Sequence, residues 1–365
     1  MNFYAGLFSH NDRPSNQEHK DVELGVDAFA ASLVDLKPQD IFSFKDINDA
    51  ISALKPGKAA GIGGISNEFL IHGRCKSLSD LLKLFFNSAY RTGVLPDDFN
   101  TAILIPIPKS DKITTPADYR PISLSTPLAT IFETLILNKL PCLLELSPNQ
   151  FGYTKKTSCK NAVFVANEAI GFYEAGRSNM HVISLDAAKA FDKLWREGLF
   201  TKLISKSDPG IWRILHNYYS LSRIVVNVGG CRSGVIKTTQ GIKQGGVISG
   251  YLFNYFMNDL IMNCLDLNIG ALLGDSNVSC LAYCDDLLLL SPTKKHMDIL
   301  LDTCLKYANS WKIKFNPSKS VSFSLRRPDG AHFLANGHPS QPNSGKWLRL
   351  FGDANQSFNL YCRLF

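Results

Sequence analysis

The alternation of apolar and polar positions in the first third of the chain predicts a helix followed by extended segments. Residues 43–57, SFKDINDAISALKPG, place apolar side chains at helical spacing behind a capping pattern of Ser43 and Asp46. The apolar segments FNTAILIPIPKSDK and DYRPISL are typical of strands, and PLATIFETLILNKL is typical of a helix. Residues 1–42 show little period, and we interpret them as a linker or an N-terminal remnant.

The period changes in the middle of the chain, within MHVISLDAAKAFDKLWREGLFTKLIS. HVISL is typical of a strand, whereas apolar residues recur at helical spacing from Asp192 onward. Asp186 therefore comes at the carboxyl end of a strand, where an aspartate serves either as a catalytic acid or as a helix cap. The segment RIVVNVGGCRSGVIKTTQGI predicts a hairpin around its Gly-Gly turn.

Two apolar stripes after residue 250 predict two core helices. The first stripe consists of Leu252, Phe253, Phe256, Met257, Leu260, Ile261 and Cys264, and the second of Met297, Leu300, Leu301, Cys304, Leu305, Ala308 and Trp311. Between them, VSCLAYC and LLLLSP predict a hairpin that bends at Asp285 and Asp286 and exposes both carboxylates at its tip. KIKFNPSKSVSFSL predicts a second pair of strands around a turn. The pattern fades over residues 326–365, which we expect to be poorly ordered or truncated.

The order of elements from HVISL onward is strand, helix, helix, hairpin, helix, hairpin. This order predicts an α+β fold in which helices pack on one side of an antiparallel sheet. The length of 365 residues exceeds that of a typical single core, so we expect two or three subdomains.

Composition and charge narrow the class of protein. Lys and Arg number 39 against 32 Asp and Glu, and the resulting net charge of +7 fits a polyanionic partner as well as an ordinary basic protein. The nine cysteines form no CxxC pair, which favours free thiols in a reducing compartment. The N-terminus lacks the order of a secretory signal, and no apolar run is long enough to span a bilayer. We therefore expect a soluble intracellular protein of the cytoplasm or nucleus with no membrane partner.

The adjacent carboxylates of Asp285 and Asp286 raise a question of electrostatics. Two like charges repel and lose hydration when their strand is packed, and a divalent cation removes both costs. A third carboxylate from Asp186 would complete an oxygen-rich site of the kind that Mg²⁺ prefers. Two such ions would suit an in-line phosphoryl transfer. The alternative is a simple polar turn, because aspartate is a favoured turn residue.

Seven motifs in order carry a resemblance to a known family. ISLDAAKAFDKL, GIKQGGVIS, LAYCDD and FNPSKS resemble the successive palm motifs of reverse transcriptases. KPGKAAGIGGISNEFL, LIPIPKSDK with YRPISL, and SPNQFGYTKKTS resemble the fingers motifs of the non-LTR (LINE-type) retrotransposon branch. The resemblance implies a right-hand polymerase fold. Its expected parts are fingers at 43–180, a palm at 181–325 in which 206–245 partly returns to the fingers, and a connection at 326–365 to a missing or truncated thumb.

The resemblance also implies roles for the palm residues. Asp186 and Asp285 would hold two Mg²⁺ ions, with Mn²⁺ as a possible substitute, and Asp286 would be the third acid of the cluster. Lys319 would protonate the leaving pyrophosphate. On its own, Lys319 is equally a solvated turn lysine.

Five further residues match substrate-binding positions of the family. Phe191 would be the aromatic gate that crowds a ribose 2′-hydroxyl, although it could equally be a core residue. Gln244 and Gly245 would lie beneath the incoming nucleotide, where glycine permits close approach. Lys109 and Arg120 would grip the triphosphate, although both are also plausible as solvated surface charges.

The resemblance implies an RNA-directed DNA polymerase of a non-LTR retrotransposon, which adds dNTPs to a primer 3′-hydroxyl. Its partners would be an RNA template, a DNA primer and dNTPs, and the sequence does not indicate an oligomeric state. The rival hypothesis is a truncated, inactive relic that at most binds RNA weakly, and it is favoured by the expected loss of the thumb and by Gly63 where the family usually has Asp. A group II intron maturase or an RNA-dependent RNA polymerase is a further alternative, and Phe191 argues against the latter.

Overall fold

The computed structural model describes residues 2–8, 15–96 and 99–325. The chain packs as two compact units, each built from two separate stretches of sequence. Unit 1 contains residues 1–143 and 191–252, and unit 2 contains residues 144–190 and 253–365. The functional division of the chain into fingers, palm and flanking segments stays a prediction.

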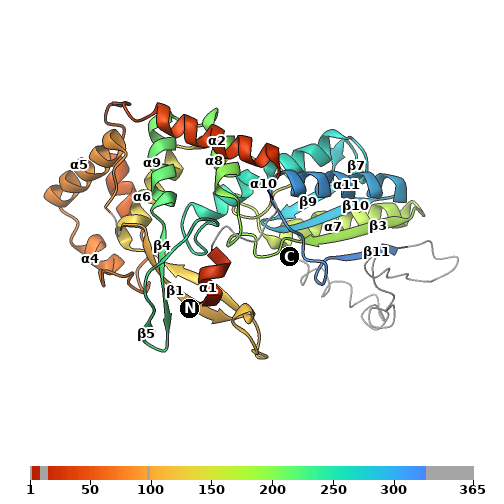
Figure 1. The fold of residues 1–365 in the computed structure, drawn as a ribbon. Helices are drawn as coiled ribbons and strands as arrows, with labels where there is room; N and C mark the ends of the chain where they lie inside the picture. The colour runs from red at the N-terminus through yellow and green to blue at the C-terminus, as the bar shows by residue number, and fades with distance from the viewer. Residues whose placement is uncertain (1, 9–14, 97–98, 326–365) are drawn as a thin grey trace. The chain divides into compact units, whose positions relative to one another are not determined.

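Unit 1 combines helices with a mixed sheet (Figure 1). The helices are α1 (Asn2–Phe8), α2 (Gln17–Ser32), α3 (Phe44–Ser52), α4 (Asn67–His72), α5 (Lys76–Thr92), α6 (Pro127–Asn138), α8 (Arg196–Ile204) and α9 (Pro209–Ser220), with short 3-10 turns at Pro116–Asp118 and Pro141–Leu143. Helix α3 confirms the predicted cap, since Ser43 and Asp46 bond reciprocally to each other's backbone N–H groups. Helix α10 (Ser249–Asp266) begins in unit 1 and continues into unit 2.

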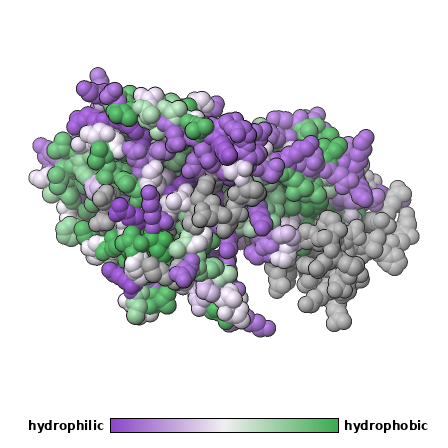
Figure 2. Space-filling view, in the orientation of Figure 1, coloured by the Kyte–Doolittle hydropathy of each residue, from purple (hydrophilic) through white to green (hydrophobic). Residues whose placement is uncertain are grey.

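Helix α2 is a regular element within residues 1–42, where the sequence shows little period, and the interpretation of this segment as a linker or an N-terminal remnant stays a prediction. Asn16 caps it in a reciprocal capping box with His19. Its buried stripe is narrow, consisting of His19 and Val26, and hydrophilic side chains predominate over it in Figure 2. The ring of His19 lies edge-on to Trp195, with the ring centroids 5.1 Å apart. The period is therefore too weak to see in the sequence, because packing against α8 rather than amphipathicity stabilises the helix.

The sheet of unit 1 has the order β2-β1-β4-β5, with β6 also paired to β4. Its strands are β1 (Thr101–Pro108), β2 (Tyr119–Leu124), β4 (Arg223–Val228), β5 (Cys231–Arg232) and β6 (Ile236–Lys237). β1 pairs with β2 antiparallel and with β4 parallel. The predicted hairpin after Arg223 is confirmed, and Gly229 and Gly230 both take positive φ angles at its turn, 58° and 86°.

Unit 2 contains the second sheet, in which all neighbouring strands are antiparallel. Its order is β11-β3-β10-β9. The elements of this unit are α7 (Cys159–Ala175), β3 (Met180–Asp186), β7 (Leu272–Leu273), β8 (Ser276–Asn277), β9 (Cys280–Tyr283), β10 (Asp286–Ser291), α11 (Lys294–Ser310) and β11 (Val321–Leu325). The predicted α+β class with an antiparallel sheet backed by helices is confirmed.

Helices cover both faces of this sheet, which corrects the prediction that they pack on one side. Leu288 and Leu290 of β10 join the core cluster formed with α7. On the other face, the thiol of Cys280 meets those of Cys264 on α10 and Cys304 on α11. The four leucines of β10 are all buried, because a strand packed on both faces needs an unbroken apolar run rather than alternation.

The two predicted helical stripes differ in their outcome. All seven residues of the α10 stripe are buried. On α11, Leu305 is wrongly placed in the core, since it is 51% exposed. Tyr307 takes the buried position instead, and its hydroxyl donates to the carbonyl of Phe256. The expectation of poor order from Arg326 onward lies outside the described residues. In the described part of the chain, no helix combines the length and apolar character that crossing a membrane would require.

Candidate active site

Two of the predicted acids face each other at one end of the two central strands of the sheet in unit 2. Asp186 is the last residue of β3, as predicted, and Asp286 is the first residue of β10. The antiparallel register pairs these two residues directly. Residues so paired have Cα atoms about 4.5–5.5 Å apart, and their side chains lie on the same face of the sheet.

The turn between β9 and β10 differs from the predicted hairpin tip. Asp286 belongs to the strand rather than to the bend, and the turn consists of Cys284 and Asp285. Asp285 and Asp286 are both half-buried, so the prediction of two exposed carboxylates is wrong. Cys284 is buried and takes a left-handed conformation with φ of 58°, which a residue other than glycine rarely adopts. The turn is tight because β9 ends at Tyr283 and β10 begins at Asp286, which leaves two residues to reverse the chain.

The electrostatics of the cluster follow from this packing. Burial raises the pKa of Asp286 to about 7, and the charges of Asp285 and Asp186 add to the rise. Lys319 opposes the rise. Burial also raises the pKa of Cys284 to about 12, with Asp285 and Asp286 contributing, so the thiol beside the acids stays protonated and inert at neutral pH. The site therefore concentrates negative charge that a cation would relieve.

Lys319 reaches the acids from the turn before β11. Its Nζ lies 3.3 Å from Oδ1 of Asp186, and its side chain is 64% exposed. Asn316 shapes the turn: its N–H donates to the carbonyl of Asp186, and its side-chain oxygen accepts from the N–H and hydroxyl of Ser318. Only the second of the two strands predicted here is present, as β11. The first is a single bridge between Phe315 and Ala187.

In unit 1, the β1–β2 hairpin carries the two predicted phosphate-binding cations. Lys109 directly follows β1, and its Nζ donates to the carbonyl of Ala117 at 2.7 Å. Arg120 pairs in register with Ile107 of β1. Both cations are exposed. The hairpin thus places them near each other, as expected for side chains at one end of paired strands.

The other three predicted substrate residues of unit 1 also lie together. The carbonyl of Phe191 accepts from the N–H of Ile242, and Nε2 of Gln244 donates to Oδ1 of Asp192 at 3.1 Å. Phe191 is half-buried in the turn before α8, so it is not a core residue on a helix face. Gly245 has φ of 106°, and a Cβ there would lie 3.0 Å from the carbonyl oxygen of Ser123. Only glycine suits this position.

Three buried polar residues support these segments, and the sequence analysis did not single them out. Glu133 of α6 accepts from the N–H of Val247 at 2.6 Å, just after the Gln244 turn. Arg196 donates to the carbonyl of Gly241 at 2.7 Å. Gln150 accepts from the N–H of Cys284 at 3.0 Å. The signal in the sequence is weak, since the contacts of each residue join it to segments distant in the chain.

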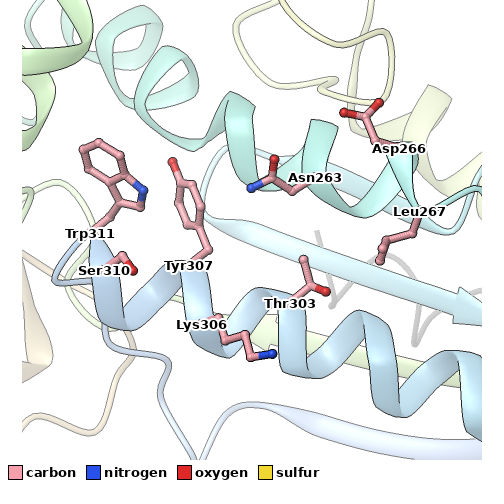
Figure 3. A pocket seen from close by; sticks show the side chains of 8 residues that line it. All are labelled: Asn263, Asp266, Leu267, Thr303, Lys306, Tyr307, Ser310 and Trp311. Atoms are coloured by element: carbon pink, nitrogen blue, oxygen red, sulfur yellow. The ribbon is translucent and has the colours of Figure 1, made fainter.

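A separate hollow of about 530 Å³ lies on α10 and α11 within unit 2 (Figure 3). Trp311, Tyr307 and the polar groups of both helices line it. The lining residues are Asn263, Asp266, Leu267, Thr303, Lys306, Tyr307, Ser310 and Trp311. None of the predicted site residues is among them, so the hollow is not part of the candidate active site.

Comparison with known proteins decides the family. Residues 107–348 match the family model described as "Reverse transcriptase (RNA-dependent DNA polymerase)". The chain belongs to the reverse transcriptase family. The resemblance seen in the seven motifs is thereby confirmed, and the sheet of unit 2 with its helices fits the right-hand polymerase fold of this family.

Curated relatives of this reverse transcriptase come from non-LTR retrotransposons. The chain is 26% identical over 249 residues to the Pol polyprotein of the type-2 element R2DM of Drosophila melanogaster, covering 68% of this chain and 24% of the relative. It is 28% identical over 336 residues to the RNA-directed DNA polymerase from the mobile element jockey of Drosophila funebris, covering 88% and 36%. The chain thus spans about a quarter to a third of the length of these relatives. The solved apo telomerase of Candida tropicalis, truncated from its C-terminal domain, has a TM-score of 0.46 and 12% identity, covering 91% of this chain and 84% of that one.

Reverse transcriptases use divalent metal ions, and the acids of unit 2 fit such an ion in their chemistry. Asp186, Asp285 and Asp286 offer only carboxylate oxygens, and burial together with the charges of Asp285 and Asp186 raises the pKa of Asp286. Within residues 2–8, 15–96 and 99–325, however, no three His, Cys, Asp or Glu side chains are already gathered closely enough to hold an ion. Lys319 contacts Asp186 in this arrangement. The donor set is right, and an ion would have to draw the carboxylates together.

Proposed function

We propose that this chain is the core of an RNA-directed DNA polymerase from a non-LTR retrotransposon, which adds dNTPs to the 3′-hydroxyl of a DNA primer on an RNA template. The family supports this reaction, and the single observation that carries it here is the pairing of Asp186 with Asp286 in register. Two carboxylates held opposite each other, with a third on the adjoining turn, have no structural purpose that a hydrophobic pair would not serve better.

In this proposal Asp186, Asp285 and Asp286 hold two Mg²⁺ ions, for which Mn²⁺ could substitute. The bound ions would favour deprotonation of the primer hydroxyl and stabilise charge on the leaving pyrophosphate. Burial raises the pKa of Asp286, and the charges of Asp285 and Asp186 add to the rise, so a bound cation would favour the ionised carboxylate there.

Lys319 would deliver a proton to the leaving pyrophosphate. Its exposure leaves the ammonium accessible to a substrate, and its contact with Asp186 keeps it beside the acids. In unit 1, Lys109 and Arg120 would contact the triphosphate, and a guanidinium binds phosphate oxygens in pairs. Gln244 and Gly245 would form the floor under the nucleotide, where the close backbone of Gly245 leaves no room for a side chain.

Phe191 would select deoxynucleotides by crowding a ribose 2′-hydroxyl. Its half-buried position leaves part of the ring available, and the hydrogen bond from Ile242 to its carbonyl fixes the backbone beside the Gln244 turn. This arrangement also favours a DNA product over an RNA product.

The cysteines support a reducing, intracellular setting for this activity. Eight cysteines lie in the described part of the chain, and all eight are free thiols. Four of them are buried, where an oxidising compartment would favour their pairing.

Primer extension tests the proposal. The purified chain, given oligo(dT) on poly(rA), dTTP and Mg²⁺, should extend the primer, and Asp285→Ala should not. Asp298→Ala is the matched control, since it removes an exposed aspartate on α11 of the same unit. It should extend like wild type. Absence of product from a folded wild-type protein would reject the proposal and favour the inactive relic.

A further inference from the structure

The turn of Cys284 and Asp285, which leads into Asp286, contains a backbone conformation that is unfavourable for a residue other than glycine. Cys284 has φ of 58°, in the left-handed region that favours glycine. The two acids follow it immediately, so the direction of their side chains depends on this one residue. A residue in this conformation persists only when its surroundings hold it there.

Gln150 supplies the contact that holds the turn. Its Oε1 accepts from the N–H of Cys284 at 3.0 Å and from the N–H of Gly152 at 2.9 Å. The side chain is 0% exposed, so no water competes for these bonds. Both acceptor bonds assign the oxygen of the amide unambiguously, because two N–H groups cannot point at an NH₂ group.

The backbone around Gln150 is itself fixed to the same strand. The N–H of Phe151 donates to the carbonyl of Ala282 at 2.8 Å, and the N–H of Ala282 donates to the carbonyl of Asn149 at 2.8 Å. Gln150 thus forms a parallel bridge with Ala282 on the edge of β9 that β10 does not occupy. Ala282 lies two residues before Cys284. The backbone of Gln150 is therefore fixed beside the turn, and its side-chain amide can reach the N–H of Cys284.

Gly152 brings the same segment into direct contact with the turn. A Cβ there would lie 2.4 Å from Sγ of Cys284 and 2.8 Å from its nitrogen. The carbonyl of Gly152 accepts from Nδ2 of Asn254 on α10 at 2.5 Å. The turn is therefore packed against a backbone that α10 holds from the other side.

We propose that Gln150 is a positioning residue: it holds Cys284 in the left-handed conformation and thereby directs Asp285 and Asp286 toward Asp186. The consequence for metal binding rests on the proposed function, whereas the fixation of the turn does not. The experiment therefore measures the fixation of the turn and the binding of the metal separately.

Three variants of the full chain make the test. Gln150→Met removes the acceptor and keeps the length of the side chain. Gln150→Glu keeps an acceptor oxygen at the same place but adds a charge at a fully buried position beside the acids, so it is compared by thiol labelling and not by Mn²⁺ binding. Asn258→Leu is the control, because Oδ1 of Asn258 accepts from the N–H of Ser147 in the same unit but does not contact the turn. Thermal unfolding establishes that each variant is folded.

The first readout is binding of Mn²⁺ alone, measured from the spin-resonance signal of the free ion. Gln150→Met should weaken binding by about 10-fold, as supporting residues behind metal ligands commonly do. Asn258→Leu should stay within about threefold of wild type, because it does not free the turn. Asp285→Ala, measured alongside, reports whether the acids bind the ion at all.

The second readout is alkylation of Cys284 by iodoacetamide, located by mass spectrometry. The thiol is buried in the wild type, and Gln150→Met should increase its labelling several-fold while leaving Cys264 and Cys304 unchanged. Increased labelling of Cys284 in Gln150→Met would support the role of Gln150. If Asp285→Ala at the same time binds Mn²⁺ as tightly as wild type, the metal site is rejected and the role of Gln150 is kept. Unchanged labelling and unchanged Mn²⁺ binding in folded Gln150→Met would overturn the inference and keep the proposed function.

If Gln150→Met does not fold, hydrogen exchange of the wild type decides instead. The amide of Cys284 donates to a buried acceptor, so it should exchange as slowly as the amides of β10. Rapid exchange at Cys284 beside slow exchange in β10 would contradict the inference.

Discussion

Asp186 and Asp286 lie directly opposite each other on the antiparallel strands β3 and β10. Because burial and its acidic neighbours raise the pKa of Asp286 to about 7, the folded protein holds a proton there that the unfolded chain has already released above its ordinary pKa of 3.8. The free energy of unfolding of the metal-free protein should therefore fall as the pH rises toward and through 7.

The variant Asp286→Asn isolates this effect, since it keeps the shape and removes the titration. Relative to Asp286→Asn, the wild type should lose about 1–2 kcal/mol of stability between pH 5 and pH 8, after allowance for the screening of a half-buried group. Urea unfolding in the presence of a chelator measures it, and addition of Mg²⁺ should abolish the loss. Parallel pH profiles of the two proteins would contradict the prediction.

Lys319 should affect catalysis and metal binding in opposite directions. Its ammonium lies 3.3 Å from Asp186 and lowers the pKa of Asp286, so Lys319→Ala removes a positive charge that competes with a metal cation for the acids. Primer extension should slow by about 10- to 100-fold with the loss of a general acid, while Mn²⁺ binds at least as tightly as before. Lys314→Ala serves as the control cation in unit 2. Weaker Mn²⁺ binding in Lys319→Ala would show that the lysine stabilises the fold of the turn instead.

The sequence predicts the elements of this fold well where the signal comes from residues close together in the chain. The α10 stripe, the cap at Ser43 and the end of β3 at Asp186 all follow from periodicity and capping chemistry. Leu305 is wrong because the buried face near the end of α11 runs through Cys304, Tyr307 and Ala308, where Tyr307 can bury its ring and still find a hydrogen bond. Helix α2 was missed because its packing against α8 is a long-range property.

The candidate site shows the same limit. The motifs predict Asp186, Asp285 and Asp286 as the acids of the site, but they do not predict the local geometry, since Asp286 is a strand residue and the turn consists of Cys284 and Asp285. Gln150 lies 134 positions before Cys284, and a hydrogen bond over that separation leaves no periodic trace. Residues that hold a site together are harder to predict than residues that form it, because their role depends on tertiary contacts.

Phe191 should control the choice between deoxyribonucleotides and ribonucleotides. Phe191→Ala removes a half-buried ring next to the Gln244 turn, so ribonucleotides should be incorporated at least about 10-fold better relative to dNTPs, the scale expected for removing a steric exclusion in a pocket. Competing dTTP and UTP on poly(rA) measures the ratio. Phe172→Ala, which removes an exposed ring from α7, is the control and should leave the ratio unchanged. An unaltered ratio in Phe191→Ala would assign the ring to packing alone.

Glu133 should be essential for the stability of unit 1. Its carboxylate is 1% exposed and accepts from the hydroxyl of Tyr218 at 2.7 Å and from the N–H of Val247 at 2.6 Å. The hydroxyl of Tyr218 in turn accepts from Nζ of Lys243 at 2.9 Å. Burial lowers the pKa of Lys243 to about 8, and Glu133 is the group that opposes this fall. Without Glu133, the buried Lys243 would lose the carboxylate that opposes the fall of its pKa.

Glu133→Ala should therefore destabilise the protein by about 3–5 kcal/mol at pH 7, the usual cost of breaking a buried charge pair from one side. Glu133→Gln should cost less, because it keeps an acceptor for the N–H of Val247. Adding Lys243→Met to Glu133→Ala should recover part of the loss, since the unpaired charge is then gone. Urea unfolding at pH 7 compares the four proteins. Equal stability of Glu133→Ala with and without Lys243→Met would show that the carboxylate acts only as an acceptor for backbone N–H groups and not as a counter-charge.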